Sequence, residues 1–282
     1  MIRNSEMFMK IIFLLSACVS VLAVVFICAF LFISGIPAVK EIGLFDFLLG
    51  MHWRPGQEQY GIFPMIIGSI YVTAGAIVVG VPIGLLTAVF MAEYCPGKLY
   101  VFFKTIIELL AGIPSIVFGF FGLMVIVPGM QVLFGGTGKG LLTASILLGI
   151  MILPTIINVA ESNIRAVPKV YYDGSRALGA TKERSIFKAV VPAAKMGIMT
   201  GVILGIGRAI GETMAVVMVC GNQAIMPESI TSGVRTLTAN IVLEMGYASG
   251  LHRDALIATA LVLFVFILIL NISFKVLKGW GE

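Results

Sequence analysis

The chain has 282 residues, of which 59% are hydrophobic and only 12% are charged, and its mean hydropathy is +1.08. Soluble domains carry about 25% charged residues, so the composition excludes a soluble globular protein and predicts a membrane protein with little mass outside the bilayer. The net charge of +5 needs no nucleic acid to explain it, because lysines and arginines on the cytoplasmic side of a membrane protein give the same excess. The cysteines have neither metal-site nor disulfide-framework spacing, so no metal and no cofactor are expected: Cys18, Cys28, Cys95 and Cys220.

Six apolar stretches are long enough to cross a bilayer, for which a helix needs about 20 mostly apolar residues. The first, residues 11–33, exceeds the apolar core of about 7–15 residues found in secretory signals, so we expect a retained helix. The other five are residues 64–92, 100–127, 140–159, 196–220 and 255–274. The sequence therefore predicts an all-α membrane protein with six transmembrane helices.

The connections between these spans set the orientation. Polar loops are expected at 34–63, 131–139, 161–195 and 222–254. Of the 19 lysines and arginines, 13 fall on the side of the two termini and loop 161–195, and 5 fall on the other side. Positive charge collects on the cytoplasmic side, so both termini are predicted to be cytoplasmic. The organisation expected is an N-terminal helix with an external loop (1–63), a transmembrane domain (64–276) containing a cytoplasmic loop (161–195), and a short tail (277–282).

Prolines fall inside three of the predicted spans, at Pro82, Pro114 and Pro154. Each removes a backbone hydrogen bond, which membrane helices tolerate where neighbours or a water-filled cavity satisfy the freed groups. The pattern fits ordinary kinked helices and fits helices bent around a pathway.

Two charges stand in the middle of the fifth span, Arg208 and Glu212. On insertion scales each costs about 2.5–3.5 kcal/mol at a helix centre. Residues four apart share one face of a helix and can pair, so one interpretation is a structural salt bridge. The other is the lining of a pathway, which we prefer because burying both charges costs more than pairing readily returns.

The loop before this span predicts a helix, a glycine corner and a second helix. Pro168 suits a first helical turn and Gly179 a left-handed stop. Thr181 can cap a second helix, which Pro192 would separate from the next span. Such a basic amphipathic face can dock in a partner's groove or rest on anionic lipid headgroups.

The same loop resembles the EAA loop of bacterial ABC importer permeases. The family pattern is Glu-Ala-Ala, three residues, Gly, nine residues, then Ile-x-Leu-Pro. Here Gly179 and Pro192 match, Asp173 and Ser175 replace Glu and Ala, and Ala189 and Val191 replace Ile and Leu. The resemblance implies a coupling helix that sits in a cleft of a separate ATPase subunit, since no GxxxxGK[S/T] motif occurs in the chain. The coupling residues that it implies are Asp173, Gly174, Ser175, Ala177, Leu178, Gly179, Ala180, Ile186, Phe187 and Pro192.

Three further stretches are similar to phosphate ABC importer permeases, and more closely to the PstC type of the two paralogous subunits. They are GIGRAIGETMAV (205–216), ELLAGIPS (108–115) and YGIFP (60–64), and the loop PESITSGVRTLTANI (227–241) supports the finer assignment. The resemblance implies the type I ABC importer (MetI-like) architecture in a bacterial inner membrane. It also implies a second permease of the PstA type, two ATPase subunits of the PstB type and a phosphate-binding protein of the PstS type. The chain itself would then be a transport subunit and no enzyme.

For a phosphate pathway, donor and acceptor counting suggests roles for the charged pair. Arg208 offers a fork of N–H donors that matches an oxyanion. Glu212 can accept from the P–OH that phosphate keeps near neutral pH and that sulfate lacks, and it can neutralise Arg208 when the path is empty. Candidate hydroxyl donors along the path are Thr73, Ser115 and Thr213.

Glycines at regular spacing in the fifth span are expected to form a packing face. Gly197, Gly201 and Gly205 recur every four residues and allow close helix approach, which we expect to be within the subunit.

The rival functions are a permease for another oxyanion, such as sulfate or molybdate, and an ion-coupled secondary carrier. The absence of inverted halves argues against the secondary carrier.

Overall fold

Two long helices with small residues at their contact form the centre of the molecule. The computed structural model describes residues 2–279, and in it α3 (Phe63–Val89) packs along α7 (Leu141–Arg165). A Cβ added at Gly80 of α3 would lie 2.7 Å from the carbonyl oxygen of Gly149 in α7. Small residues let membrane helices approach closely, so the glycines of α3 determine which of its faces meets α7.

Helix α11 (Lys195–Gly211) packs on another side of α7. A Cβ added at Gly201 would lie 3.1 Å from Val159 Cβ, and one added at Gly205 would lie 2.9 Å from Ile156 Cγ1. Gly197 faces Asn163 in the same way. The prediction that this glycine face packs within the subunit is therefore confirmed.

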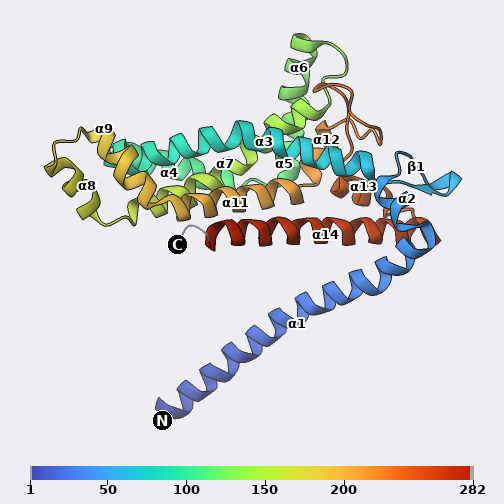
Figure 1. The fold of residues 1–282 in the computed structure, drawn as a ribbon, viewed down its shortest axis with the longest axis horizontal. Coiled ribbons are helices and arrows are strands. Elements are labelled where there is room, and N and C mark those ends of the chain that lie inside the picture. Colours follow the sequence, from blue (N-terminus) through green and yellow to red (C-terminus); the bar gives the residue numbers. More distant parts are fainter. Residues whose placement is uncertain (1, 280–282) are drawn as a thin grey trace.

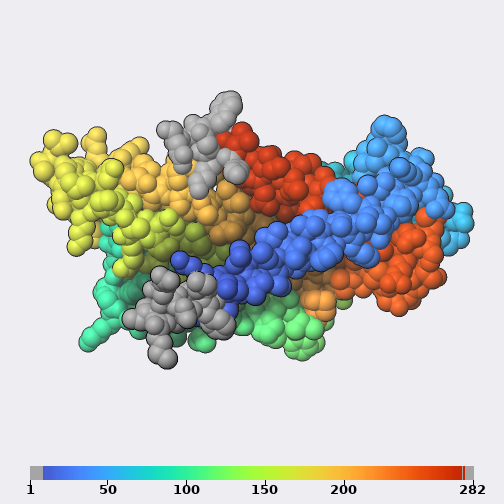
Figure 2. Space-filling model, turned by 90° about the horizontal axis from the view of Figure 1, so that it is seen from below, coloured from blue at the N-terminus to red at the C-terminus, as the bar shows by residue number. Residues whose placement is uncertain are grey.

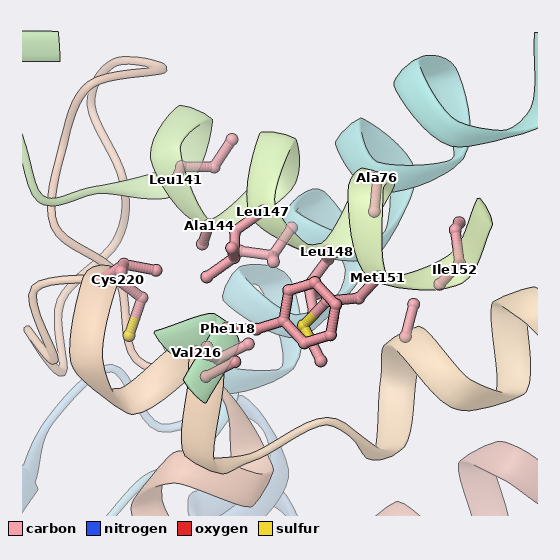
Figure 3. Close-up of a cluster of buried hydrophobic side chains, with 14 of the residues drawn as sticks. Ala76, Phe118, Leu141, Ala144, Leu147, Leu148, Met151, Ile152, Val216 and Cys220 are labelled. Carbon is pink, nitrogen blue, oxygen red and sulfur yellow. The ribbon is translucent and has the colours of Figure 1, made fainter. Parts of the chain in front are cut away.

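The main apolar cluster lies where α7 meets α3, α5 (Ser115–Phe121) and α12 (Met214–Val219). Phe118 of α5 and Val216 of α12 point toward Leu147 and Met151 of α7 (Figure 3). Lipid is as apolar as these side chains, so close packing between the helices, rather than escape from water, holds this cluster together.

The first helix is longer than predicted and leaves the bundle. Helix α1 runs over Ile2–Ile42 instead of residues 11–33. Near its C-terminal end Gly35 and Ala38 pack on α14 (Gly250–Gly279). Toward its N-terminus α1 diverges from the other helices (Figure 1) and forms a ridge across one face of the molecule (Figure 2), with its apolar side chains exposed.

The segment predicted as a polar loop over 34–63 is mostly ordered structure. After α1 come α2 (Leu44–Leu49), β1 (Trp53–Arg54), the 3-10 turn η1 (Pro55–Gln57) and β2 (Gln59–Tyr60). The strands form an antiparallel hairpin in which Trp53 pairs with Tyr60. Both aromatic rings are buried while Arg54 and Gln59 are exposed, as the two-residue period of a strand requires. We call this end of the bundle the hairpin end.

The third predicted span is broken. Helix α4 (Gly97–Gly112) ends before Pro114, and α5 starts again at Ser115. A π-helical stretch, η3 (Gly122–Ile126), then leads into α6 (Val127–Phe134), which projects from the bundle (Figure 1). Part of the predicted loop 131–139 is therefore helical. Of the three prolines considered, only Pro114 interrupts a helix, since Pro82 and Pro154 lie inside continuous ones.

The fifth predicted span is broken as well. Helix α11 ends at Gly211, and the short helix α12 begins at Met214. The following loop contains another unpredicted helix, α13 (Leu237–Glu244), before α14. Thr236 accounts for α13 locally, because its hydroxyl accepts a hydrogen bond from the amide of Ala239 as an N-cap.

The elbow of residues 168–193 lies at the end of the bundle opposite the hairpin (Figure 1). It consists of α8 (Lys169–Ala177), a corner with Gly179 at φ +85°, α9 (Lys182–Ser185), the π-helical η4 (Ile186–Val190) and α10 (Val191–Ala193). Thr181 caps α9 by accepting from the amide of Arg184. The helix–glycine–helix prediction is confirmed. The helix nevertheless passes through Pro192 to Ala193 and bends by 69° only there, before α11.

Five helices are long and apolar enough to cross a membrane: Met9–Ile42, Phe63–Tyr94 (α3 with its π-helical extension η2, Phe90–Tyr94), Ser115–Phe134, Leu141–Arg165 and Gly250–Phe274. The bent pair that ends in α11 provides a sixth span if it is counted as one. Within the residues described, the six-span all-α architecture thus agrees with the prediction.

Candidate functional site

Two helix breaks lie close together in the middle of the bundle and define the candidate site. One separates α4 from α5 at Ile113 and Pro114, and the other separates α11 from α12 at Glu212 and Thr213. The helices that follow the breaks pack together, since a Cβ added at Gly119 of α5 would lie 3.0 Å from the Cα of Ala215 in α12. Broken helices at membrane depth occur where the backbone is buried in protein or lines a cavity.

Arg208 lies one turn before the second break, on a face of α11 that is free of contacts with the rest of the chain. Leu204, Gly207, Arg208 and Gly211 are all exposed, and at helical spacing they share one side of α11. A Cβ added at Gly207 or Gly211 would meet nothing within 4 Å. We call these four residues the open face of α11. Among the side chains that the structure describes, none forms an ion pair or a hydrogen bond with the Arg208 guanidinium.

The salt-bridge interpretation of Arg208 and Glu212, the less favoured of the two, does not hold in this conformation, because the two residues are not on one helix. The helix stops at Gly211, and Glu212 has an extended backbone with φ −70° and ψ 131°. Its Oε1 instead accepts from the amides of Thr213 (3.1 Å) and Ala215 (3.3 Å). The carboxylate therefore satisfies the first amides of α12, whose donors have no partner inside the helix. Its Oε2 makes no hydrogen bond within the described part of the chain.

The predicted hydroxyl residues divide between the breaks and the packed interior. Ser115 is the first residue of α5, directly after the first break, and Thr213 is the last residue of the second break. The Thr213 hydroxyl donates to the carbonyl of Gly211 at 3.2 Å. Thr73 is 7% exposed within α3 and lies on its packed side with Val72 and Ala76. The structure therefore brings Ser115 and Thr213 to breaks and leaves Thr73 in the interior.

The predicted coupling residues are mostly exposed at the elbow. Leu178 is 91% exposed and Phe187 48% exposed, and no atom lies within 4 Å of a Cβ added at Gly174 or Gly179. Other exposed members are Asp173, Ala177 and Pro192, while Ser175 and Ala180 are half-buried. Ile186 differs, because it is 0% exposed and packs with Ile164 and Val190. It anchors the elbow to α7 and does not present its side chain to a partner.

A buried ion cluster lies near the elbow, and no role was predicted for its residues. Glu161 of α7 is 2% exposed. Lys104 of α4 donates to it at 3.2 Å, Tyr100 donates at 3.1 Å, and Arg165 forms an ion pair with it. The sequence signal that could have revealed this cluster is the spacing of Glu161 and Arg165, which have opposite charges and lie one turn apart in α7. The cluster joins α4, the helix that precedes the first break, to α7.

A second polar network, at the hairpin end, was missed altogether. Glu244 of α13 accepts from Trp53 Nε1 (2.8 Å), from Arg235 (2.6 Å) and from His252 Nε2 (2.8 Å). Burial alone would raise the pKa of Glu244, but the hydrogen bonds from Trp53, Arg235 and His252 together lower it below the ordinary 4.5. The participants come from separate parts of the chain, so no local pattern could have joined them.

Comparison with known proteins identifies the family of this chain. Residues 80–280 match the family described as binding-protein-dependent transport system inner membrane component. The chain is 40% identical over 266 residues to the probable ABC transporter permease protein YqgH of Bacillus subtilis, covering 90% of this chain and 86% of the relative. It is 37% identical over 256 residues to the phosphate transport system permease protein PstC of Mesorhizobium japonicum, covering 83% of this chain and 78% of the relative.

A solved structure with the same fold is an inward-facing MetNI methionine ABC transporter, matched with a TM-score of 0.64 at 20% identity over 82% of this chain and all of that one. At this identity the match establishes the fold alone. Permease relatives of this kind are not enzymes themselves, and they imply an ATPase and a substrate-binding protein as partners in general. The chain therefore belongs to the family of binding-protein-dependent transport system inner membrane components, as a multi-pass permease subunit of an ABC transporter.

Proposed function

We propose that the chain is the PstC-type permease subunit of an ATP-driven inorganic phosphate importer. The observation that carries this proposal is Arg208, an unpaired guanidinium on the open face of α11 beside two helix breaks. Several relatives that bear the name PstC support the choice of phosphate, including the one from Haemophilus influenzae at 34% identity over 93% of this chain. An ionisable residue placed at membrane depth marks a substrate route by default.

In this proposal Arg208 attracts the anion, because its planar fork of donors matches two oxygens of a phosphate at once. Ser115 and Thr213 supply hydroxyls at the two breaks, and Thr73 contributes only if α3 moves. Glu212 has a modified role. Its Oε1 is committed to the amides of α12, so the atom left to accept a P–OH proton is Oε2. Sulfate has no such proton and leaves that carboxylate oxygen facing a second anion.

The partners follow from which surfaces are free. The exposed elbow residues, Leu178 and Phe187 foremost, fit the groove of an ATPase of the PstB type, present as a dimer. The open face of α11 would meet a second permease of the PstA type across the pathway. The hairpin end would receive a phosphate-binding protein of the PstS type.

This assignment also orients the chain in the bilayer. The elbow and both termini would be cytoplasmic and the hairpin external, in the inner membrane of a bacterium. The transmembrane domain would comprise 64–276 with its coupling loop at 161–195. Residues 1–63 would form a separate N-terminal helix with its external hairpin, and 277–282 a short tail, of which 280–282 lie outside the described residues.

A permease for another oxyanion is the remaining alternative, because the family match sets aside a secondary carrier. Reconstituted complexes in proteoliposomes, supplied with ATP inside or outside as orientation requires, distinguish the two. Phosphate uptake is expected and sulfate uptake is not, and Glu212→Gln should narrow the discrimination between them. Equal uptake of sulfate by the unmodified complex, or a Glu212→Gln variant with unchanged uptake and discrimination, would refute the assignment.

A further inference from the structure

The short helix α12 is held at both ends by residues of one neighbouring segment, 235–244. At its N-terminal end, the hydroxyl of Thr238 in α13 donates to the backbone carbonyl of Glu212 at 3.1 Å. At its C-terminal end, Arg235 Nε donates to the carbonyl of Asn222 at 3.0 Å, and the Asn222 side chain donates to the carbonyl of Val217 at 2.8 Å. Thr238 of α13 and Arg235 therefore hold the two ends of α12, while its sides pack on α5 and α7.

The same segment is joined to the hairpin through Glu244. The indole N–H of Trp53 in β1 and one guanidinium nitrogen of Arg235 both donate to this carboxylate. His252 Nε2 of α14 also donates to it, and the Trp53 and His252 rings lie 6.1 Å apart edge to face. Glu244 therefore connects three parts of the chain: the hairpin through Trp53, helix α14 through His252, and Arg235, which holds the C-terminal end of α12. We call Glu244 and these three donors the joint. Hydrogen bonds to a charged group are shorter and stronger than those between neutral groups, so the Glu244 carboxylate holds its three donors in place.

The hairpin has an exposed polar side and a buried aromatic side, and Trp53 on the aromatic side contacts the joint. Its outward residues, including Arg54, Glu58 and Gln59, are exposed and polar, whereas Trp53 and Tyr60 turn inward and are 7% and 5% exposed. Their rings pack edge to face at 5.7 Å. Any shift of the hairpin caused by a protein docked on its outer side would therefore move Trp53, and with it the donor to Glu244.

One group in the network is unsatisfied. Asn240 of α13 is 0% exposed, and its Oδ1 accepts from Arg235 at 3.0 Å, which fixes the amide orientation. Its Nδ2 has no partner in the described part of the chain. A buried donor without a partner destabilises the arrangement that leaves it unpaired, and a movement of α13 that gave Asn240 an acceptor would relieve this cost.

We propose that the chain from Trp53 through Glu244 and Arg235 to Thr238 is a relay by which a protein docked on the hairpin shifts α12 and the Arg208–Glu212 break. Glu244, Arg235 and Thr238 are positioning residues in this relay and do not touch the substrate. The identity of the docking protein as the substrate-delivering partner rests on the proposed function. The mechanical link itself does not.

The relay is tested by placing a reporter at the break in the full chain, in lipid nanodiscs. Gly211→Cys puts a thiol on the open face of α11, and its labelling rate with a small methanethiosulfonate reagent is measured against the same chain without it, which accounts for the native cysteines. Trp53→Phe removes the hairpin's donor, Glu244→Gln removes the charge of the joint, and Thr238→Val removes the hydroxyl at the break. Each should change the labelling rate at least about fivefold, the lower end for coupling between distinct sites.

Thr259→Val is the matched control. Thr259 is a buried threonine of α14 whose hydroxyl donates only to the carbonyl of Ala255 in its own helix, so its loss should leave the labelling rate unchanged. Trp53 and Thr238 make no hydrogen bond to each other, and for independent sites the effects of two substitutions add. In the Trp53→Phe/Thr238→Val double variant the effects should fall well short of the sum, because both interrupt one route.

Additive effects, or a response to Thr259→Val equal to that of Thr238→Val, would overturn the relay. A rate at Gly211→Cys that stays unchanged in Trp53→Phe would do so as well, and this mild variant keeps the test decisive if Glu244→Gln fails to fold. None of these readouts involves phosphate. If the labelling pattern is as expected while reconstituted complexes take up no phosphate, the relay stands and the proposed cargo is wrong.

Discussion

Arg208 and Glu212 are four residues apart in the fifth span but do not pair, because helix α11 ends at Gly211 between them. Glu212 turns instead to the amides of Thr213 and Ala215 and caps the next helix. The consequence is a guanidinium left available on an open helix face and a carboxylate with one uncommitted oxygen. Two charges that look like a self-neutralising pair in the sequence are therefore two separate groups in the structure.

The first prediction concerns the charge on the open face. Arg208→Ala should lower phosphate uptake by reconstituted complexes at least about tenfold, since a charge-assisted contact to an anion contributes about 1.5–3 kcal/mol. Arg208→Lys should fall between, because it keeps the charge but loses the fork. Leu204→Ala, one turn earlier on the same face, is the control for lost side-chain bulk and should transport at nearly the normal rate. Equal losses in Leu204→Ala and Arg208→Ala would contradict a role for the charge.

The second prediction contrasts two glycines of α11. Gly205→Ala should destabilise the subunit by about 1–3 kcal/mol, the usual effect of overpacking, because the new Cβ would lie 2.9 Å from Ile156 Cγ1. Gly207→Ala meets open space and should stabilise the helix by up to about 1 kcal/mol. Thermal unfolding of the isolated subunit in detergent measures both. Similar melting temperatures for the two variants would show that the face assignment is wrong.

The third prediction separates docking from folding at the elbow. Leu178 is 91% exposed, whereas Ile186 is 0% exposed. Leu178→Asp should abolish co-purification of the ATPase subunit while leaving the thermal stability of the permease unchanged. Ile186→Asp should lower that stability first, because it buries an unpaired charge. Retention of the ATPase by a stable Leu178→Asp variant would exclude Leu178 from the interface.

The fourth prediction follows from the lowered pKa of Glu244. A carboxyl whose pKa is lower in the folded state stabilises that state above its ordinary pKa of 4.5, and this contribution disappears as the pH falls through the lowered value. The unmodified subunit should therefore melt at a higher temperature than Glu244→Gln at pH 7, and the gap should close below about pH 4.5. A gap that persists unchanged to the lowest pH at which both fold would mean that the charge of Glu244 does not stabilise the protein.

Local signals in the sequence account for the features that were predicted correctly. The corner at Gly179 and the cap at Thr181 depend on residues within one turn, and the glycines of α11 at four-residue spacing mark its packed face. The spans depend on apolar length alone. These are the elements for which short-range chemistry decides the structure.

The misses depend on contacts that are distant in sequence or on competing local choices. The stretch around Glu212 contains no proline, so a continuous helix was the natural expectation, and the break forms because the carboxylate caps α12. Helix α13 lies in a polar loop, and Trp53, which donates to its residue Glu244, is 191 residues away in the sequence. The end of α1 is helical because Gly35 and Ala38 pack on α14, which no pattern within α1 reveals.

The interlocked glycines of α3, α7 and α11 have a consequence for how access to the pathway can alternate. Helices whose backbones touch through glycine cannot slide or rotate past one another without collision, since the side chains of Ile152, Ile156 and Val159 fill the facing hollows. The three helices must tilt together as one slab. The bending then falls on the two interruptions, at 113–114 and 212–213, and on the 69° corner before α11. A tilt of these three helices as one unit would therefore change the angles at the two breaks, including the one beside Arg208, and leave the packing between the helices intact.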